Sequence, residues 1–143
     1  MRYFFIFLFI GGMVNSLRAQ DLDKHRWKDR VLLLITRDLK NPEYIRQTNA
    51  LQEHPAELEE RKLVVYTLLE NRFVEGLPPG PWKKGRPLKI GAKNNPTDFR
   101  VVLIGLDGGV KLDEPSHVPI EVLSALIDGM PMRRAELKNK GNP

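Results

Sequence analysis

A short, unbroken apolar run, VLLLIT at residues 31–36, constrains the fold more than any other stretch of this sequence. Short continuous runs rich in branched apolar residues are typical of strands buried on both faces, whereas half-exposed strands alternate apolar and polar residues. The run therefore predicts a central strand of a sheet. A second run, LVVYTLL at residues 63–69, predicts another strand of the same kind.

The segment between these two runs carries the signals of a helix. Asn41 suits the N-cap position and Pro42 suits the first helical position. The helix should end or bend before Pro55. The residues spaced to share one of its faces are Tyr44, Thr48 and Leu51. A strand, a helix and a strand in this order form a right-handed crossover, which makes the two strands parallel.

The second half of the chain predicts a hairpin. Residues 99–106, FRVVLIGL, and residues 109–112, GVKL, have the composition of strands. They are joined by Asp107 and Gly108, a pair that accepts the positive φ angles of a type I′ turn. Residues 70–98, which precede the hairpin, contain nine Gly or Pro. We predict no regular element there, and the stretch is either a functional loop or conceals a helix.

An amphipathic helix is predicted from Pro119 onward, and Gly129 and Pro131 end it or break it. The apolar residues that recur on one face of this helix are Ile120, Leu123 and Ile127. The element order is then β-α-β, an irregular connection and β-β-α, which is the order of the thioredoxin fold. We therefore expect an α/β, thioredoxin-like domain with a mixed four-stranded sheet flanked by helices.

The first nineteen residues have the features of a secretory signal peptide. Arg2 precedes an apolar stretch, polar residues follow it, and Ala19 suits the cleavage site. The apolar stretch is shorter than the ~20 residues that span a membrane, although an uncleaved anchor is the alternative. We expect an exported periplasmic or extracellular protein without a membrane span after cleavage. Its single domain should cover residues 20–138, followed by a disordered tail at residues 139–143.

The sequence contains no cysteine, which excludes thiol–disulfide chemistry, disulfide bonds and metal sites built on thiolates. The histidines His25, His54 and His117 lack a second ligand at the spacing of a metal motif. No nucleophile elbow or phosphate-binding glycine loop is present. We therefore expect no metal or cofactor. The net charge of +5, which falls to +3 without the leader, does not by itself indicate nucleic acid as a partner.

Two stretches near the end of the chain carry a family resemblance, FRVVLIGLDGGVKL at 99–112 and IDGMPMRR at 127–134. In both, the sequence resembles the bacterial domain of unknown function 4174, also called the P-DUDES domain. The family tends to have an aromatic residue and an arginine before its first strand, matched by Trp27 and Arg30. The resemblance covers residues 25–138.

This resemblance implies a thioredoxin-like domain without a conserved pair of redox cysteines and without an established activity. It also implies relatives in vertebrate extracellular proteins, including sushi-repeat matrix proteins. The chain departs from the pattern at Leu106, where the family usually has lysine, and at Asp113, where it often has arginine. These departures weaken any anion contact ascribed to the family at the hairpin.

The first candidate site is the loop after the first strand, where an active thioredoxin carries its cysteine pair. Here Arg37 and Asp38 precede a capped helix N-terminus, whose N–H groups could bind a small anion. The alternatives are a structural connection with a salt bridge, or an enzyme that uses these two side chains. Pro96 lies shortly before the third predicted strand, near the place where thioredoxins keep a cis-proline.

The second candidate site is a basic loop in which an aromatic residue lies among cations. It comprises Trp82, Lys83, Lys84 and Arg86. Such a loop could bind the sulfate of a polysaccharide, a phosphate or the backbone of a nucleic acid. The alternative is a solvated loop whose tryptophan packs on the core.

The third candidate site is the segment that follows the last predicted helix. It comprises Met130, Met132, Arg133 and Arg134. Methionines adapt to irregular apolar surfaces and arginines make forked contacts to carboxylates, so this segment could bind a partner. Alternatively, the methionines pack the last helix onto the sheet.

These features favour a non-catalytic binding or structural protein of the bacterial envelope. Its expected partner is an unidentified protein or an anionic polysaccharide rather than nucleic acid. The competing hypothesis is an enzyme whose reaction uses Arg37 and Asp38.

Overall fold

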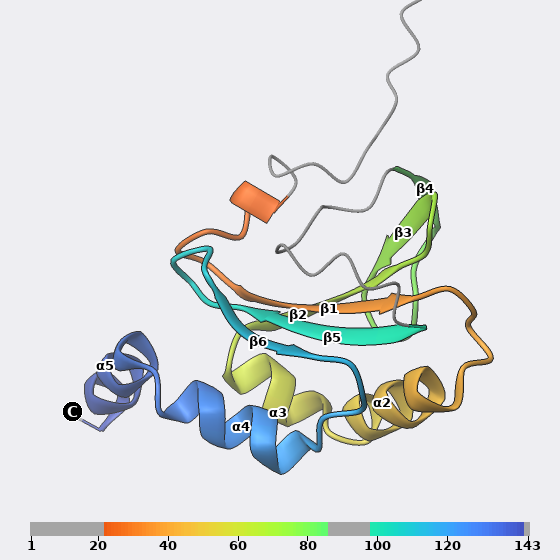
Figure 1. Cartoon of the computed structure of the whole chain (residues 1–143). Helices are drawn as coiled ribbons and strands as arrows, with labels where there is room; N and C mark the ends of the chain where they lie inside the picture. Colours follow the sequence, from red (N-terminus) through yellow and green to blue (C-terminus); the bar gives the residue numbers. More distant parts are fainter. Residues whose placement is uncertain (1–21, 86–97, 142–143) are drawn as a thin grey trace, which may run out of the picture.

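The computed structural model describes residues 22–85 and 98–141. The predicted signal peptide, Arg86 and Pro96 lie outside these ranges. Within them the chain forms six strands and four helices (Figure 1). The strands are β1 (Arg30–Thr36), β2 (Leu63–Leu68), β3 (Arg72–Glu75), β4 (Lys83–Lys84), β5 (Phe99–Ile104) and β6 (Val110–Glu114). The helices are α2 (Pro42–Gln52), α3 (Pro55–Glu60), α4 (Ile120–Asp128) and α5 (Pro131–Lys140).

The six strands form one mixed sheet in the order β4-β3-β2-β1-β5-β6. β1 and β2 are parallel, and every other neighbouring pair is antiparallel. β1 lies in the middle, where Leu32 pairs with Val65 of β2 and with Leu103 of β5. The α/β class and the central parallel pair predicted from the two apolar runs are therefore confirmed.

β1 is buried on both faces because its side chains alternate between two apolar clusters. Leu32 and Leu34 belong to the larger cluster, whereas Val31 and Leu33 belong to the smaller one on the opposite face. The three leucines are fully buried. This arrangement explains why the run lacks the alternation of apolar and polar residues that marks a strand with one wet face.

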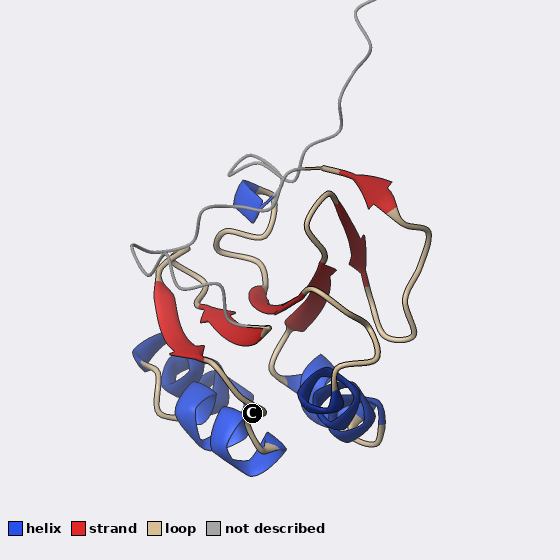
Figure 2. Cartoon of the chain, turned by 45° about the vertical axis from the view of Figure 1, so that its right-hand side comes forward, coloured by secondary structure: helices blue, strands red, loops and turns tan. Residues whose placement is uncertain are grey.

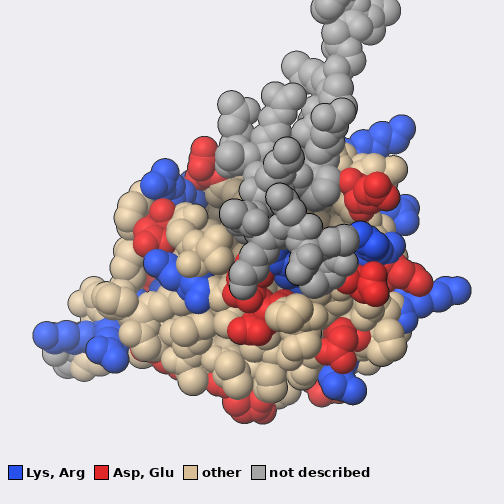
Figure 3. Space-filling view, viewed as in Figure 1, with Lys and Arg blue, Asp and Glu red and all other residues tan. Residues whose placement is uncertain are grey.

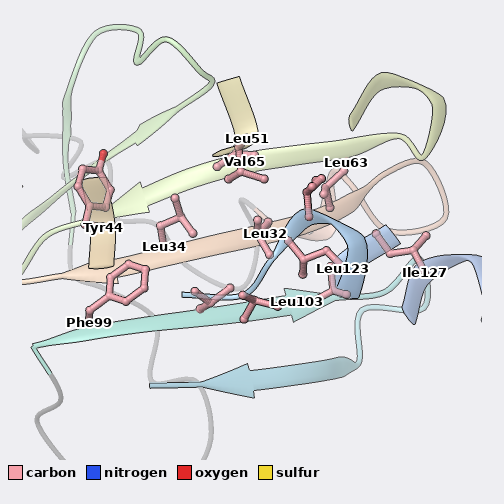
Figure 4. Close-up of a cluster of buried hydrophobic side chains, with 13 residues drawn as sticks. Leu32, Leu34, Tyr44, Leu51, Leu63, Val65, Phe99, Leu103, Leu123 and Ile127 are labelled. Carbon is pink, nitrogen blue, oxygen red and sulfur yellow. The ribbon is translucent and has the colours of Figure 1, made fainter. Parts of the chain in front are cut away.

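All four helices cover the same face of the sheet (Figures 1 and 2). Figure 4 shows the core that they enclose, with Leu51 of α2 and Leu123 and Ile127 of α4 packed toward the leucines of β1. These three helix residues are all 0% exposed. Burying a leucine or isoleucine side chain contributes about 1.5–3 kcal/mol, so this layer fixes α2 and α4 to the sheet.

The start of α2 has the predicted cap. The side chain of Asn41 accepts hydrogen bonds from the backbone N–H of Glu43 at 2.9 Å and of Tyr44 at 3.4 Å. Pro42 occupies the first turn, and the helix ends before Pro55 as predicted. Pro55 then begins α3, a short helix that was not predicted from the sequence.

The predicted count of four strands is wrong. β3 and β4 lie in the stretch of residues 70–98 where no regular element was predicted, and they extend the sheet beyond β2. β3 forms because Phe73 and Val74 are buried, with Phe73 opposite Leu68 of β2. Strands of four and two residues are too short to show a period among so many glycines and prolines.

The predicted type I′ turn is also wrong. The loop of the β5–β6 hairpin has three residues, 106–108, and the N–H of Gly105 donates to the carbonyl of Gly109 at 2.9 Å. Only Gly108 in this loop has a positive φ, 81°. A three-residue loop with one left-handed glycine at its end is a common alternative to the two-residue turn.

A second helix follows the break at Gly129. Helix α4 stops at Asp128, and α5 begins at Pro131 and continues to Lys140, across the predicted domain boundary at residue 138. None of the helices in residues 22–85 and 98–141 combines the length and apolar character needed to cross a membrane.

Candidate functional site: a pocket between the hairpin and the last two helices

A cavity of about 540 Å³ lies between the end of the β5–β6 hairpin and the junction of α4 and α5. The hairpin contributes Leu106, Asp107 and Lys111. The helix junction contributes a wall of Ala125, Leu126, Gly129, Met130, Pro131 and Met132, and Arg30 from the start of β1 completes the lining. The two stretches that carry the family resemblance thus meet at one pocket.

The hairpin side of the pocket is held by a local ion pair. Lys111 donates from Nζ to a carboxylate oxygen of Asp107 at 2.9 Å, and Asp107 also accepts the N–H of Gly109 at 2.9 Å. The hydrogen bond from Lys111, more than any other contact, holds the pKa of Asp107 below its ordinary value. Gly105 permits this arrangement, because a Cβ there would lie 2.7 Å from Cε of Lys111.

The helix side of the pocket is apolar and adaptable. Met130 is half-buried against the larger apolar cluster, whereas Met132 is 42% exposed at the mouth of the pocket. In Figure 3, uncharged surface separates the charged side chains at the hairpin end from those of α5, at the left of the view. Flexible thioether side chains fill irregular space and adjust to different apolar groups.

Next to this wall, buried arginines form a network of ion pairs with carboxylates of the neighbouring helices. Arg133 is 1% exposed and donates to carboxylate oxygens of Asp128 at 3.1 Å and Glu60 at 2.8 Å. Arg61 is 8% exposed and donates to Asp128 at 2.8 Å and to Glu57 at 2.6 Å. The network therefore ties α3 to α4 and α5.

Asp128 is the carboxylate that these two arginines share. Burial raises the pKa of Asp128, but hydrogen bonds from Arg61 and Arg133 outweigh that effect and hold it below its ordinary value. Burial lowers the pKa of Arg133, yet its bonds to Asp128 and Glu60 raise it overall. The group is therefore ionised and structural at neutral pH.

Arg30 is the least well compensated of the three buried arginines. It is 0% exposed and donates to the carbonyl of Arg61 at 2.9 Å, but both of its contacts to Glu136 are 3.5 Å long. Its Nε has no hydrogen-bond partner in the part of the chain that the structure describes. Of the three arginines, Arg30 alone lines the pocket.

The first predicted site lies away from this pocket. Arg37 and Asp38 follow the end of β1 opposite to the end at which Arg30 lies. Both are exposed: the Arg37 side chain lies 3.8 Å from the carboxylate of Asp98, and Asp38 accepts the N–H of Lys40 at 2.9 Å. These local contacts fit a structural connection, and they give no support to an enzyme that uses the two side chains.

The second predicted site lies at the β4 edge of the sheet, the edge opposite β6. The guanidinium of Arg72, the first residue of β3, lies 4.9 Å from the ring centroid of Trp82, so a cation already covers one face of this ring. Lys83 and Lys84 are exposed on β4, and Arg86 lies outside the described residues.

The residues of the third predicted segment, at the start of α5, point to different places. Met130 and Met132 line the pocket, Arg133 points into the ion-pair network, and Arg134 is exposed. Asp107 and Lys111 were not predicted as site residues from the sequence, and Arg30 was predicted only as a match to the family pattern. Their convergence could not be read from spacing, since they come from β1 and the hairpin.

A second polar cluster lies on the face of the sheet away from the helices. His25, 6% exposed, contacts the carboxylate of Asp29 through Nδ1 at 2.8 Å and the hydroxyl of Tyr66 through Nε2 at 2.7 Å. The Tyr66 hydroxyl donates to Glu75 at 3.0 Å, and Lys24 lies 3.3 Å from the same carboxylate. This cluster fixes the segment before β1 onto β2 and β3.

No group of three potential metal ligands occurs within the described ranges.

A comparison with known protein families decides the classification. The sequence profile of the domain of unknown function DUF4174 matches residues 21–136. The chain belongs to the DUF4174 family. No curated protein and no solved structure gives a significant match. The DUF4174 match includes every residue of the pocket and of the ion-pair network described above.

Proposed function

We propose that this DUF4174 chain is an exported, non-catalytic binding module of the bacterial envelope. The pocket between the hairpin and the α4–α5 junction carries this proposal, because a concave, mainly apolar site of several hundred Å³ with a few polar groups is the usual form of a small-ligand site. The pocket holds no cysteine or histidine and no pair of carboxylates poised for acid–base chemistry. Binding is therefore the activity that its lining supports.

We further propose that the fold is a modified thioredoxin fold. Four neighbouring strands of the sheet, in the order β2-β1-β5-β6 with β1 parallel to β2, support this relationship. The additions β3 and β4, and the placement of all four helices on one face, are departures from it. The loop that carries the cysteines in thioredoxin carries Arg37 and Asp38 here, so the proposed binding site has moved to the other end of β1.

The proposal predicts that small apolar compounds bind at this pocket. Adding a fragment library to ¹⁵N-labelled protein should shift the amide signals of Gly105, Leu106 and Gly129. Met132→Asp should reduce these shifts, because it places a charge at the mouth. Leu137→Asp is the matched control, since Leu137 is 40% exposed on the same helix and does not line the pocket.

Two results would count against a binding function for this pocket. One is a library that leaves the three amides unshifted. The other is a set of shifts that Met132→Asp and Leu137→Asp change equally.

A further inference from the structure

The polar groups that line the pocket differ in how completely their hydrogen bonds are satisfied, and this difference points to the chemistry of the ligand. Arg30 is a permanently charged guanidinium with no exposed surface, and a buried charge requires an anionic partner. Its contacts to Glu136 are 3.5 Å, longer than the 2.7–2.9 Å of charge-assisted bonds. Glu136 lies closer to Arg133, at 3.3 Å. The wall of the pocket therefore carries a cation with unused donor capacity.

Lys111 supplies a second, adjustable cation at the rim. Its only hydrogen bond to a carboxylate within the described residues is to Asp107, in a pair whose side chains are 35% and 46% exposed. Such exposed pairs contribute little to stability, so the ammonium can turn to another anion at small cost. Asp107 keeps the N–H of Gly109 as a partner when Lys111 turns away.

The remaining wall favours an apolar body. Leu126, Met130, Pro131 and Met132 offer no charged group, and the methionines can move aside to let a ligand reach the guanidinium of Arg30. We propose that the pocket binds a small carboxylic acid with an apolar chain, its carboxylate directed to Arg30 and Lys111 and its chain against the methionine wall. This inference rests on the proposed binding function and specifies its ligand class.

Calorimetric titration of the protein with three ligands of equal chain length tests the charge. Octanoate, octanamide and heptylammonium share one apolar chain and carry a negative, a neutral and a positive group. Octanoate should bind roughly tenfold more tightly than octanamide, because a charge-assisted hydrogen bond replaces a neutral one. Heptylammonium should not bind. Lengthening the acid to nonanoate and decanoate should strengthen binding about fourfold per methylene until the cavity is filled.

Variants test the placement of the ligand, and those at Lys111 and Ala125 leave the buried arginines unchanged. Lys111→Gln should weaken octanoate binding and leave octanamide binding unchanged. Ala125→Leu should weaken both, because Ala125 lines the cavity, whereas Ala135→Leu is the matched control on an exposed position of α5 outside the lining. Arg30→Lys should weaken octanoate binding further, provided that circular dichroism shows a folded protein.

The outcomes separate this inference from the proposed function. The proposed recognition of a carboxylate is overturned if octanoate and octanamide bind with equal affinity, or if Lys111→Gln leaves octanoate binding intact. Either result still leaves the pocket as a binding site. No binding of octanoate and decanoate overturns the inference as well. The binding function itself falls only if the fragment library also leaves the pocket amides unshifted.

Discussion

Arg133 and Arg134 are neighbours in the sequence but have opposite environments. Helix α5 turns Arg133 inward to 1% exposure, where three carboxylates meet its guanidinium, and leaves Arg134 exposed. The partners of Arg133 come from α3, from the end of α4 and from α5 itself. One side chain therefore joins three helices.

The burial of Arg133 gives a prediction at the scale of the residue. Arg133→Met should lower the free energy of unfolding by about 2–3 kcal/mol, because Asp128 and Glu60 lose their partner while methionine keeps most of the packing volume. The loss should lie below that of a fully buried pair, since both carboxylates remain partly exposed. Urea unfolding followed by circular dichroism measures it.

Arg134→Met is the control for this variant. It removes the same charge from an exposed position one residue along the helix, and its effect should stay within about 0.5 kcal/mol. Equal unfolding midpoints for the two variants would contradict a structural role for the Arg133 network.

Single residues also show how far the site could be predicted. Met130 and Met132 were identified because methionines adapt to irregular apolar surfaces, and both line the pocket. The roles of Arg30 and Lys111 could not be predicted. Burial of an arginine depends on carboxylates that arrive from other elements, and the sequence pattern treats such a residue as part of the surface.

At the scale of elements, the sequence predicted what is long and regular. The two apolar runs became β1 and β2, and the Asn41–Pro42 pair started α2 as expected. Pro131 was interpreted as a helix breaker, yet it occupies the first turn of α5, the position that Pro42 has in α2. A proline after a glycine fits the end of one helix and the start of the next equally well.

The hairpin loop gives a prediction at this scale. Gly108 has φ 81°, which costs an L-residue about 1 kcal/mol, and a Cβ there would meet no atom closer than 3.6 Å. Gly108→Ala should therefore destabilise the protein by about 1 kcal/mol through the backbone alone. Thermal unfolding measures the change.

Gly141→Ala provides the comparison for Gly108→Ala. Gly141 ends α5 with φ −85°, an angle that alanine adopts freely, and a Cβ there would lie 3.7 Å from its nearest neighbours. This variant should match or slightly exceed the stability of the parent protein. A Gly108→Ala protein as stable as Gly141→Ala would show that the loop does not require its left-handed residue.

At the scale of the whole molecule, two polar clusters hold the ends of the described chain on opposite faces of the sheet. The cluster of His25, Tyr66 and Glu75 fixes the segment before β1, and the arginine network around Asp128 fixes α5. Burial raises the pKa of Glu75, but hydrogen bonds from Tyr66 and Lys24 hold it below its ordinary value, as the arginines do for Asp128. Both ends of the domain therefore depend on ionised carboxylates.

This dependence predicts the response of stability to acid. A carboxyl group whose pKa is lowered by folding contributes stability that is present above its pKa in the unfolded chain and is lost as the pH falls through its pKa in the folded protein. The ordinary values for Asp128 and Glu75 are 3.8 and 4.5, so urea unfolding should give a steady free energy from pH 7 to about 5 and a falling one below it. Asp128→Asn should lower the plateau and flatten the fall, because it removes one of the carboxyl groups whose pKa is lowered by folding. Glu59→Gln, which removes a charge from an exposed side chain of α3, should keep the slope of the parent protein. If Asp128→Asn and the parent lost stability in parallel below pH 5, the arginine network would not be a source of the acid sensitivity, and the attachment of α5 would have to rest on its apolar contacts alone.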